Sequence, residues 1–183
     1  MRAMSNLIGG AVLASAITAG IIGGAIGYGS ADCATPVEPV AVTERSVYHA
    51  PSIYTDGDIE VLAKMLYGEA RGCEPINQAA AVWCVLNRVD SPEFSDTIYE
   101  VVTAPNQFHG YDPDNPVWPE LEDMTVDVLE RWTAEKLGCK DTGRVLPAEY
   151  VYFYGAGIEN RFQSEYQSRE VWEWSLPSPY EED

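Results

Sequence analysis

The sequence predicts an α+β domain that is mainly helical and carries one small β-hairpin. Three observations predict this class. Between residues 54 and 137, apolar residues recur at helical spacing in separate segments. Tyr150–Tyr154 is aromatic and β-branched, as strands are. A Gly-Ala-Gly turn at residues 155–157 follows it directly and favours a return strand.

Residues 1–30 are predicted to be a signal peptide or a membrane anchor. Leu7–Tyr28 carries no charge and is long enough to span a bilayer, and small residues before Asp32 fit a cleavage site. The Leu7–Tyr28 segment is only weakly hydrophobic because it contains many Gly and Ala residues. In this it resembles the signal-arrest-release segments of some phage endolysins. Either way, the rest of the chain is expected outside the cytoplasmic membrane, exported or anchored.

Residues 31–53 are predicted to be a linker, because they are rich in Pro and show no apolar period. Residues 54–183 then form the folded domain. Its first helix is predicted over Asp58–Gly72, with Gly72 as the stop and a cap at Thr55, Asp56 or Asp58. One face of this helix is apolar and holds Ile59, Leu62, Leu66 and Ala70.

Glu69 falls inside that apolar face. Its helical neighbours supply no counter-charge, and a carboxyl on an apolar face has its pKa raised. A raised carboxyl pKa suits a general acid near neutral pH. The alternative is a buried Glu paired with a distant Arg, such as Arg88 or Arg161.

The remaining elements follow in order. Pro at the first helical position and an apolar run predict a central helix from Glu74-Pro75 to Val89. A Pro-rich stretch before the last helix predicts an irregular loop. The other expected elements are a short packed segment at Thr97–Thr103, that loop at Ala104–Pro119, a helix over about Glu120–Leu137 and a second strand around Val171–Ser175.

The charge balance excludes some partners. The chain has 11 basic and 29 acidic residues, a net charge of −18. Binding nucleic acid through its phosphates needs basic patches, and so does a polybasic membrane contact. Membrane contact is therefore expected through the N-terminal segment alone. The 11 Tyr and 5 Trp residues suit either a sugar-stacking cleft or a core.

Four cysteines are present: Cys33, Cys73, Cys84 and Cys139. Export permits disulfides, and the four allow three pairings. Cys84 lies in an apolar helix and is predicted to be a core residue. The chain has no C-x-x-C and only two His residues, so no metal or other cofactor is expected.

One combined motif resembles a known family. It consists of Tyr67–Gly72, Gln78, Val85–Val89 and Pro105–Phe108. This pattern resembles the catalytic domain of the spore cortex-lytic (SleB-type) cell wall hydrolases. The resemblance implies a lysozyme-like or transglycosylase-like fold, cleavage of the glycan strands of peptidoglycan, and Glu69 as the acid/base. The chain departs from the family at Cys73, where Glu is usual.

The number of catalytic carboxylates separates two reactions. A lytic transglycosylase needs one, whereas a conventional glycosidase needs two at a defined separation. Glu69 is well marked, and the other candidates, Glu74, Asp112 and Asp114, lie in loops or at a helix start where acids are usually solvated. This favours the transglycosylase, with 1,6-anhydromuramic products.

Five residues are predicted to bind substrate. Gln107 is a hydrogen-bonding candidate, with tying its loop to the backbone as its alternative role. Tyr152 and Tyr154 share one side of a strand and are candidates to line the cleft, although Tyr152 suits the core equally well. Phe108 belongs to the motif, and Asn160 follows the glycine turn.

Two other classes remain open. One is a Cys–His peptidase or amidase of the wall, with Cys73 near a helix start and His109 as its base. The other is a non-catalytic, membrane-anchored protein that binds the wall. The sequence does not choose among three biological contexts: a phage endolysin, a spore enzyme and a cell wall remodelling enzyme.

Overall fold

The computed structural model describes residues 53–180. The signal or anchor predicted for residues 1–30, the linker up to residue 52 and Cys33 lie outside this range. Within the range, no helix has the length and apolarity to cross a membrane. The elements are α1 (Asp56–Glu69), α2 (Pro75–Val89), α3 (Ile98–Thr103), α4 (Pro119–Lys136), β1 (Tyr152–Gly155) and β2 (Asn160–Gln163). The predicted α+β, mainly helical class is confirmed.

Helix α1 begins with a capping box. The Thr55 hydroxyl accepts the Asp58 backbone N–H at 3.3 Å, and the Asp58 carboxylate accepts the Thr55 N–H at 2.9 Å. This arrangement satisfies two backbone donors that the helix leaves open. The helix ends at Glu69 and not at the predicted Gly72, because Ala70 leaves helical geometry at φ −146° and ψ 8°.

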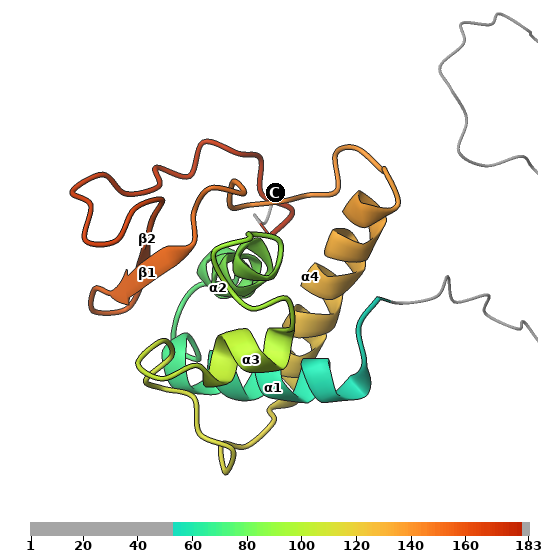
Figure 1. The fold of residues 1–183 in the computed structure, drawn as a ribbon, viewed down its shortest axis with the longest axis vertical. Coiled ribbons are helices and arrows are strands. Elements are labelled where there is room, and N and C mark those ends of the chain that lie inside the picture. Colours follow the sequence, from blue (N-terminus) through green and yellow to red (C-terminus); the bar gives the residue numbers. More distant parts are fainter. Residues whose placement is uncertain (1–52, 181–183) are drawn as a thin grey trace, which may run out of the picture. The chain divides into compact units, whose positions relative to one another are not determined.

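Helix α2 is the centre of the domain. It lies between the hairpin and α4, with α1 and α3 packed against it as well (Figure 1). Eleven of its residues are buried, including Trp83 and Cys84, so the predicted core position of Cys84 is confirmed. Within residues 53–180, Cys73, Cys84 and Cys139 form no disulfide with one another. A helix buried on nearly all sides gives the surrounding elements a fixed support.

The second strand is not where the sequence predicted it. Strand β2 is Asn160–Gln163 and pairs antiparallel with β1, with Phe153 opposite Phe162. The predicted strand Val171–Ser175 has no regular structure. Its Trp172 donates one backbone hydrogen bond to the Phe162 carbonyl at 2.9 Å and packs its ring on the core. The prediction followed the large apolar residues, whereas the short glycine turn fixes the nearer segment as the partner.

The C-terminal segment is fastened to α4 by a polar cluster. Both Asp127 oxygens accept from Arg131, at 2.8 and 2.9 Å, and the Tyr180 hydroxyl donates to Asp127 Oδ2 at 2.6 Å. Burial alone would raise the pKa of Asp127. The hydrogen bonds from Arg131 and Tyr180 outweigh burial and lower the pKa below its ordinary value.

Asp127→Asn should therefore lower the thermal midpoint at pH 7, and the loss should vanish in acid. A carboxylate whose pKa is lowered by folding stabilises the fold above its unfolded pKa, about 3.9, and loses that contribution as the pH falls through the folded-state pKa. Thermal unfolding at pH 7 and below about pH 3 measures this. Asp123→Asn, an exposed change on the same helix, is the control. An equal midpoint difference at both pH values would contradict the prediction.

Candidate active site

The Glu69 carboxylate lies at the last residue of α1 and is half-buried. Its Oε1 atom accepts a hydrogen bond from the Gly110 backbone N–H at 2.6 Å. No ion pair to Glu69 exists among residues 53–180. Arg161 pairs with Glu159, and Arg88 donates to neutral oxygens. The alternative of a Glu69–Arg88 or Glu69–Arg161 pair is therefore wrong.

Two glycines make this hydrogen bond geometrically accessible. A Cβ atom on Gly68 would lie 1.7 Å from the Gly110 carbonyl oxygen, and one on Gly110 would lie 2.5 Å from the Gly68 carbonyl carbon. Both contacts are to backbone, which cannot rotate away as a side chain can. The last turn of α1 and the loop thus touch backbone to backbone, right beside Glu69.

Side chains also fasten the loop to α1. The Lys64 ammonium donates to the Pro113 carbonyl at 2.8 Å. The Asn115 amide donates to the Lys64 carbonyl at 3.1 Å and to the Gly110 carbonyl at 2.8 Å. Residues 104–118 contain neither helix nor strand, as predicted for this loop. These bonds hold the Gly110 N–H in place against the carboxylate.

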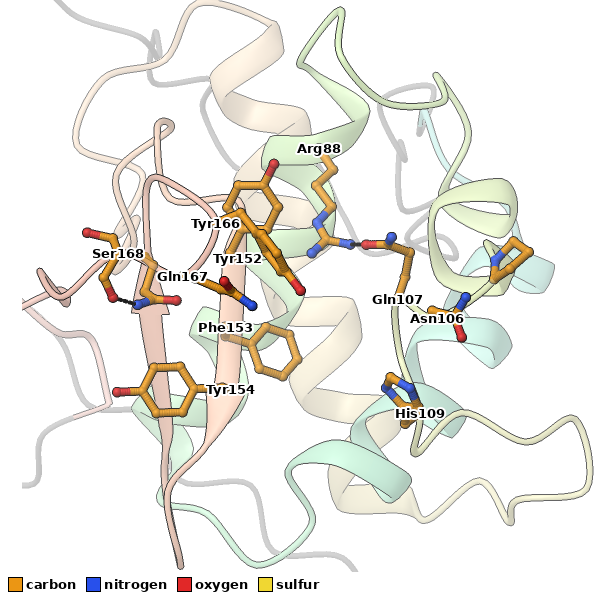
Figure 2. Close-up of a pocket in the computed structure, with 12 residues that line it drawn as sticks. Arg88, Asn106, Gln107, His109, Tyr152, Phe153, Tyr154, Tyr166, Gln167 and Ser168 are labelled. Carbon is orange, nitrogen blue, oxygen red and sulfur yellow. Dashed lines mark hydrogen bonds between the residues drawn. The ribbon is translucent and has the colours of Figure 1, made fainter.

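A cavity of about 730 Å³ opens between this loop and the hairpin (Figure 2). The loop lines one side and β1 the other, and the segment after β2 closes it. Glu69 is not among the lining residues, but His109 is, and the next residue is the Gly110 that binds Glu69. Glu69 is thus bonded, from the α1 side, to the residue that follows a lining residue. The lining is Arg88, Pro105, Asn106, Gln107, His109, Tyr152, Phe153, Tyr154, Gln163, Tyr166, Gln167 and Ser168.

The predicted binding residues divide into two groups. Gln107, Tyr152 and Tyr154 line the cavity, and Tyr154 is 48% exposed. Phe108 is buried in the core, with its ring 5.7 Å from that of Phe153, and it does not line the cavity. Phe108 therefore packs from the core side against Phe153, which lines the cavity.

Asn160 is also buried and does not reach the cavity. Its backbone N–H donates to Asn77 Oδ1 at 3.0 Å, and its carbonyl accepts from the Asn77 amide at 2.9 Å. Its own amide donates to the Glu69 carbonyl at 3.2 Å. Asn160 thus joins β2 to α2 and to the end of α1, and it lies outside the cavity lining.

No second carboxylate meets Glu69 in this region. Glu74 is exposed at the start of α2, and Asp112 and Asp114 are exposed in the loop, where Asp112 accepts the Asp114 N–H at 2.8 Å. None of them lines the cavity, and its lining contains no acidic residue.

The Cys–His arrangement finds no support in the geometry. His109 lines the cavity, Cys73 does not, and the two share no hydrogen bond in the part of the chain that the structure describes. Burial, with a contribution from Glu159, raises the pKa of the Cys73 thiol, which is the opposite of what a nucleophile needs. No group of three or more His, Cys, Asp or Glu side chains within residues 53–180 is arranged to hold a metal.

Sequence reasoning missed part of the site. Tyr166, Gln167 and Ser168 line the cavity, yet nothing in their local pattern distinguishes them from an ordinary surface loop. Asn106 and Gln167 both have positive φ, at 63° and 58°, which only the structure reveals. Gly68 belongs to the motif, but its contact with Gly110, 42 residues later, arises from tertiary packing and has no local sequence signal.

Comparison with known proteins gives a family. The model of the Cell Wall Hydrolase family matches residues 74–171. That range covers the whole lining of the cavity and begins just after Glu69. No solved structure matches the chain.

Three curated relatives are named spore cortex-lytic enzyme. The protein of Halalkalibacterium halodurans is 40% identical over 60 residues, which is 33% of this chain and 18% of the relative. That of Oceanobacillus iheyensis is 33% identical over 88 residues, 46% of this chain and 32% of the relative. That of Bacillus cereus is 37% identical over 60 residues, 33% and 23% of the two chains. The chain thus spans at most about a third of these relatives.

The family match covers more than half of the chain, and the motif that resembles the SleB-type enzymes begins just ahead of it and runs into it. This chain belongs to the cell wall hydrolase family and carries a SleB-type domain.

Proposed function

We propose that this domain cleaves the glycan strands of peptidoglycan, with Glu69 as the single general acid/base. The observation that carries the proposal is the carboxylate itself. It has no cationic partner among the described residues, and it accepts a backbone N–H from the loop that lines a large cavity without acids. The family membership and the names of the relatives support the choice of peptidoglycan.

The two carboxyl oxygens of Glu69 have different roles in this proposal. Oε1 accepts the Gly110 N–H, so the transferable proton belongs on Oε2, which has no described hydrogen bond. Oε2 gives its proton to the glycosidic oxygen as the C1–O bond breaks. The Gly110 N–H then stabilises the carboxylate that is left, because a hydrogen bond to the charged form favours that form.

The second half of the reaction returns the proton. In a lytic transglycosylase the C6 hydroxyl oxygen of the same muramic acid bonds to C1, and its proton passes to Oε2. One carboxyl thus serves as acid and then as base. The other candidate acids, Glu74, Asp112 and Asp114, are exposed to solvent, which favours this route over one with two carboxylates.

The walls of the cavity suit a sugar chain. Tyr152, Tyr154 and Tyr166 line it together with three glutamines and Asn106. Aromatic faces stack on sugar rings, and amides donate to and accept from sugar hydroxyls. Since the chain carries a net charge of −18, neutral sugar contacts of this kind explain wall recognition better than general electrostatic attraction does.

The fold and the location belong to the same proposal. A helical domain with a small hairpin and a Glu at the end of a helix is consistent with a lysozyme-like arrangement. Peptidoglycan lies outside the cytoplasmic membrane, so the domain acts there, after export or while anchored through residues 1–30. A phage endolysin, a spore enzyme and a remodelling enzyme all fit this location.

The products should end in 1,6-anhydromuramic acid. When the full chain digests purified peptidoglycan in ¹⁸O-labelled water, mass spectrometry should find anhydro ends and no incorporated label, because water takes no part in the ring closure. Reducing ends that carry ¹⁸O would instead indicate hydrolysis. A partner carboxylate would then have to be sought among Glu74, Asp112 and Asp114.

A further inference from the structure

Arg88 is a buried cation without an anionic partner. It is 4% exposed, and none of the ion pairs within residues 53–180 includes it. Its Nε–H donates to the Val151 carbonyl at 2.6 Å and its Nη1–H to Gln107 Oε1 at 2.8 Å. Arg88 was one of the two partners that the sequence offered for a buried Glu69, and that pair does not form.

The surroundings of the guanidinium are neutral. It lies over the rings of Phe108, Phe94 and Tyr152, with centroid distances of 4.8, 5.1 and 5.7 Å. Such contacts stabilise a cation without neutralising it. The neighbouring Cys84 is no counter-ion, because burial raises its pKa to about 12 and keeps the thiol neutral.

The guanidinium reaches the cavity although most of it is buried. Besides the Val151 carbonyl and Gln107, the Cys84 side chain hydrogen-bonds Arg88. The two hydrogen bonds to oxygen use Nε and Nη1, and none to oxygen uses Nη2 among residues 53–180. Figure 2 shows the guanidinium at the edge of the cavity, between Gln107 and Tyr152.

Burying a guanidinium without an anionic partner costs folding free energy, and a well-packed apolar side chain at this position would stabilise the fold at least as well. The planar guanidinium of Arg88 can donate two parallel hydrogen bonds to a carboxylate. The larger cavity that Arg88 lines contains no acid. Arg88 also lines a second cavity, of about 320 Å³, together with Glu93, but no ion pair joins the two residues. An incoming anion therefore meets a site that no protein carboxylate occupies.

We propose that Arg88 binds a carboxylate carried by the muramic acid of the glycan, either its lactyl carboxylate or that of a peptide attached to it. This inference rests on the proposed function, since it takes a glycan strand as the ligand. It makes Arg88 a residue that recognises the substituents of the strand, separate from the chemistry at Glu69.

The test measures binding by the full chain carrying Glu69→Gln, so that no ligand is cleaved. Three tetrasaccharides of alternating N-acetylglucosamine and N-acetylmuramic acid are compared. Their lactyl groups are free carboxylates, carboxamides, or capped by L-alanine with its own free carboxylate. At least one carboxylate ligand should bind about tenfold or more tightly than the carboxamide. Which of the two does so identifies the source of the carboxylate.

Gln107→Glu is the decisive variant, because it leaves Arg88 in place and supplies it with a carboxylate from within the chain. It should reduce the preference for carboxylate ligands to within about twofold, and Arg88→Gln should do the same if it folds. Gln167→Glu is the matched control. It adds the same charge to the same cavity without a described contact to Arg88. Because Gln167 also lines the cavity, all three ligands should weaken alike, while the preference for carboxylate ligands persists.

The outcomes separate the two proposals. If all three ligands bind equally, the role of Arg88 is overturned while glycan binding stands. If Gln107→Glu and Gln167→Glu weaken the preference for carboxylate ligands to the same extent, that preference comes from the overall electrostatic potential of the cavity. The proposed contact between Arg88 and the ligand carboxylate is then overturned. If no tetrasaccharide binds, the proposed function fails and the inference fails with it.

Discussion

Glu69→Gln should lower the rate of glycan cleavage by about 10²–10⁴-fold while leaving the fold intact. The amide keeps an oxygen for the Gly110 N–H, so the contact between α1 and the loop survives. What it loses is the proton that Oε2 would transfer. The measurement is the release of soluble muropeptides from purified peptidoglycan, with thermal unfolding to confirm the fold.

Asp56→Asn is the matched control for this change. Asp56 is the first residue of the same helix and is exposed, so its substitution removes one charge at the opposite end of the helix from Glu69. Its activity should stay within a few-fold of the parent. A Glu69→Gln chain that retained activity within a few-fold of the parent would remove Glu69 from the chemistry. A parent chain that binds wall without releasing fragments would instead favour the non-catalytic class.

Gly68→Ala should reduce activity by roughly two orders of magnitude, because a displacement of about 1 Å is enough to misplace a catalytic group to that extent. The new methyl would lie 1.7 Å from the Gly110 carbonyl oxygen, so the helix end or the loop must shift. Overpacking of this kind also costs about 1–3 kcal/mol of stability. Muropeptide release and denaturant unfolding measure the two effects.

Gly72→Ala separates this contact from the general cost of replacing a glycine. A Cβ atom on Gly72 meets nothing within 4 Å, and the residue is exposed just past the helix end. This variant should keep nearly full activity and stability. If Gly68→Ala behaved in the same way, the close approach of the two backbones would not be what positions Glu69.

Local signals predicted the helices well. The apolar period and the caps are properties of neighbouring residues, and they gave α2 and α4 to within one or two residues. The segment predicted at Thr97–Thr103 was placed correctly, but its helical form as α3 was not predicted. The end of α1 was misplaced because Ala70 leaves the helix under tertiary constraint, ahead of the glycine that marks a stop. Strand β2 was missed because Phe162 is its one large apolar residue, and pairing with β1 compensates for the weak pattern.

The site was predictable only in part. Motif and periodicity singled out Glu69 and, along β1, the two tyrosines that line the cavity. They gave no sign of which side of its loop Phe108 faces, or that Asn160 is buried against α2. Such facts depend on contacts between segments far apart in the chain, and a single sequence does not encode them in any local pattern.

The buried link from Asn160 to the Glu69 carbonyl has a consequence for the order in which the site is made. The two residues are 91 positions apart, and Asn77 and Asn160 are 83 apart. During synthesis the acid-bearing helix emerges long before the strand that completes the cavity wall. Contacts of such separation form late in folding, since loop closure must precede them. A nascent or truncated chain that stops before residue 160 thus possesses the acid but no cleft to hold a glycan, and cleavage begins only when the domain is complete.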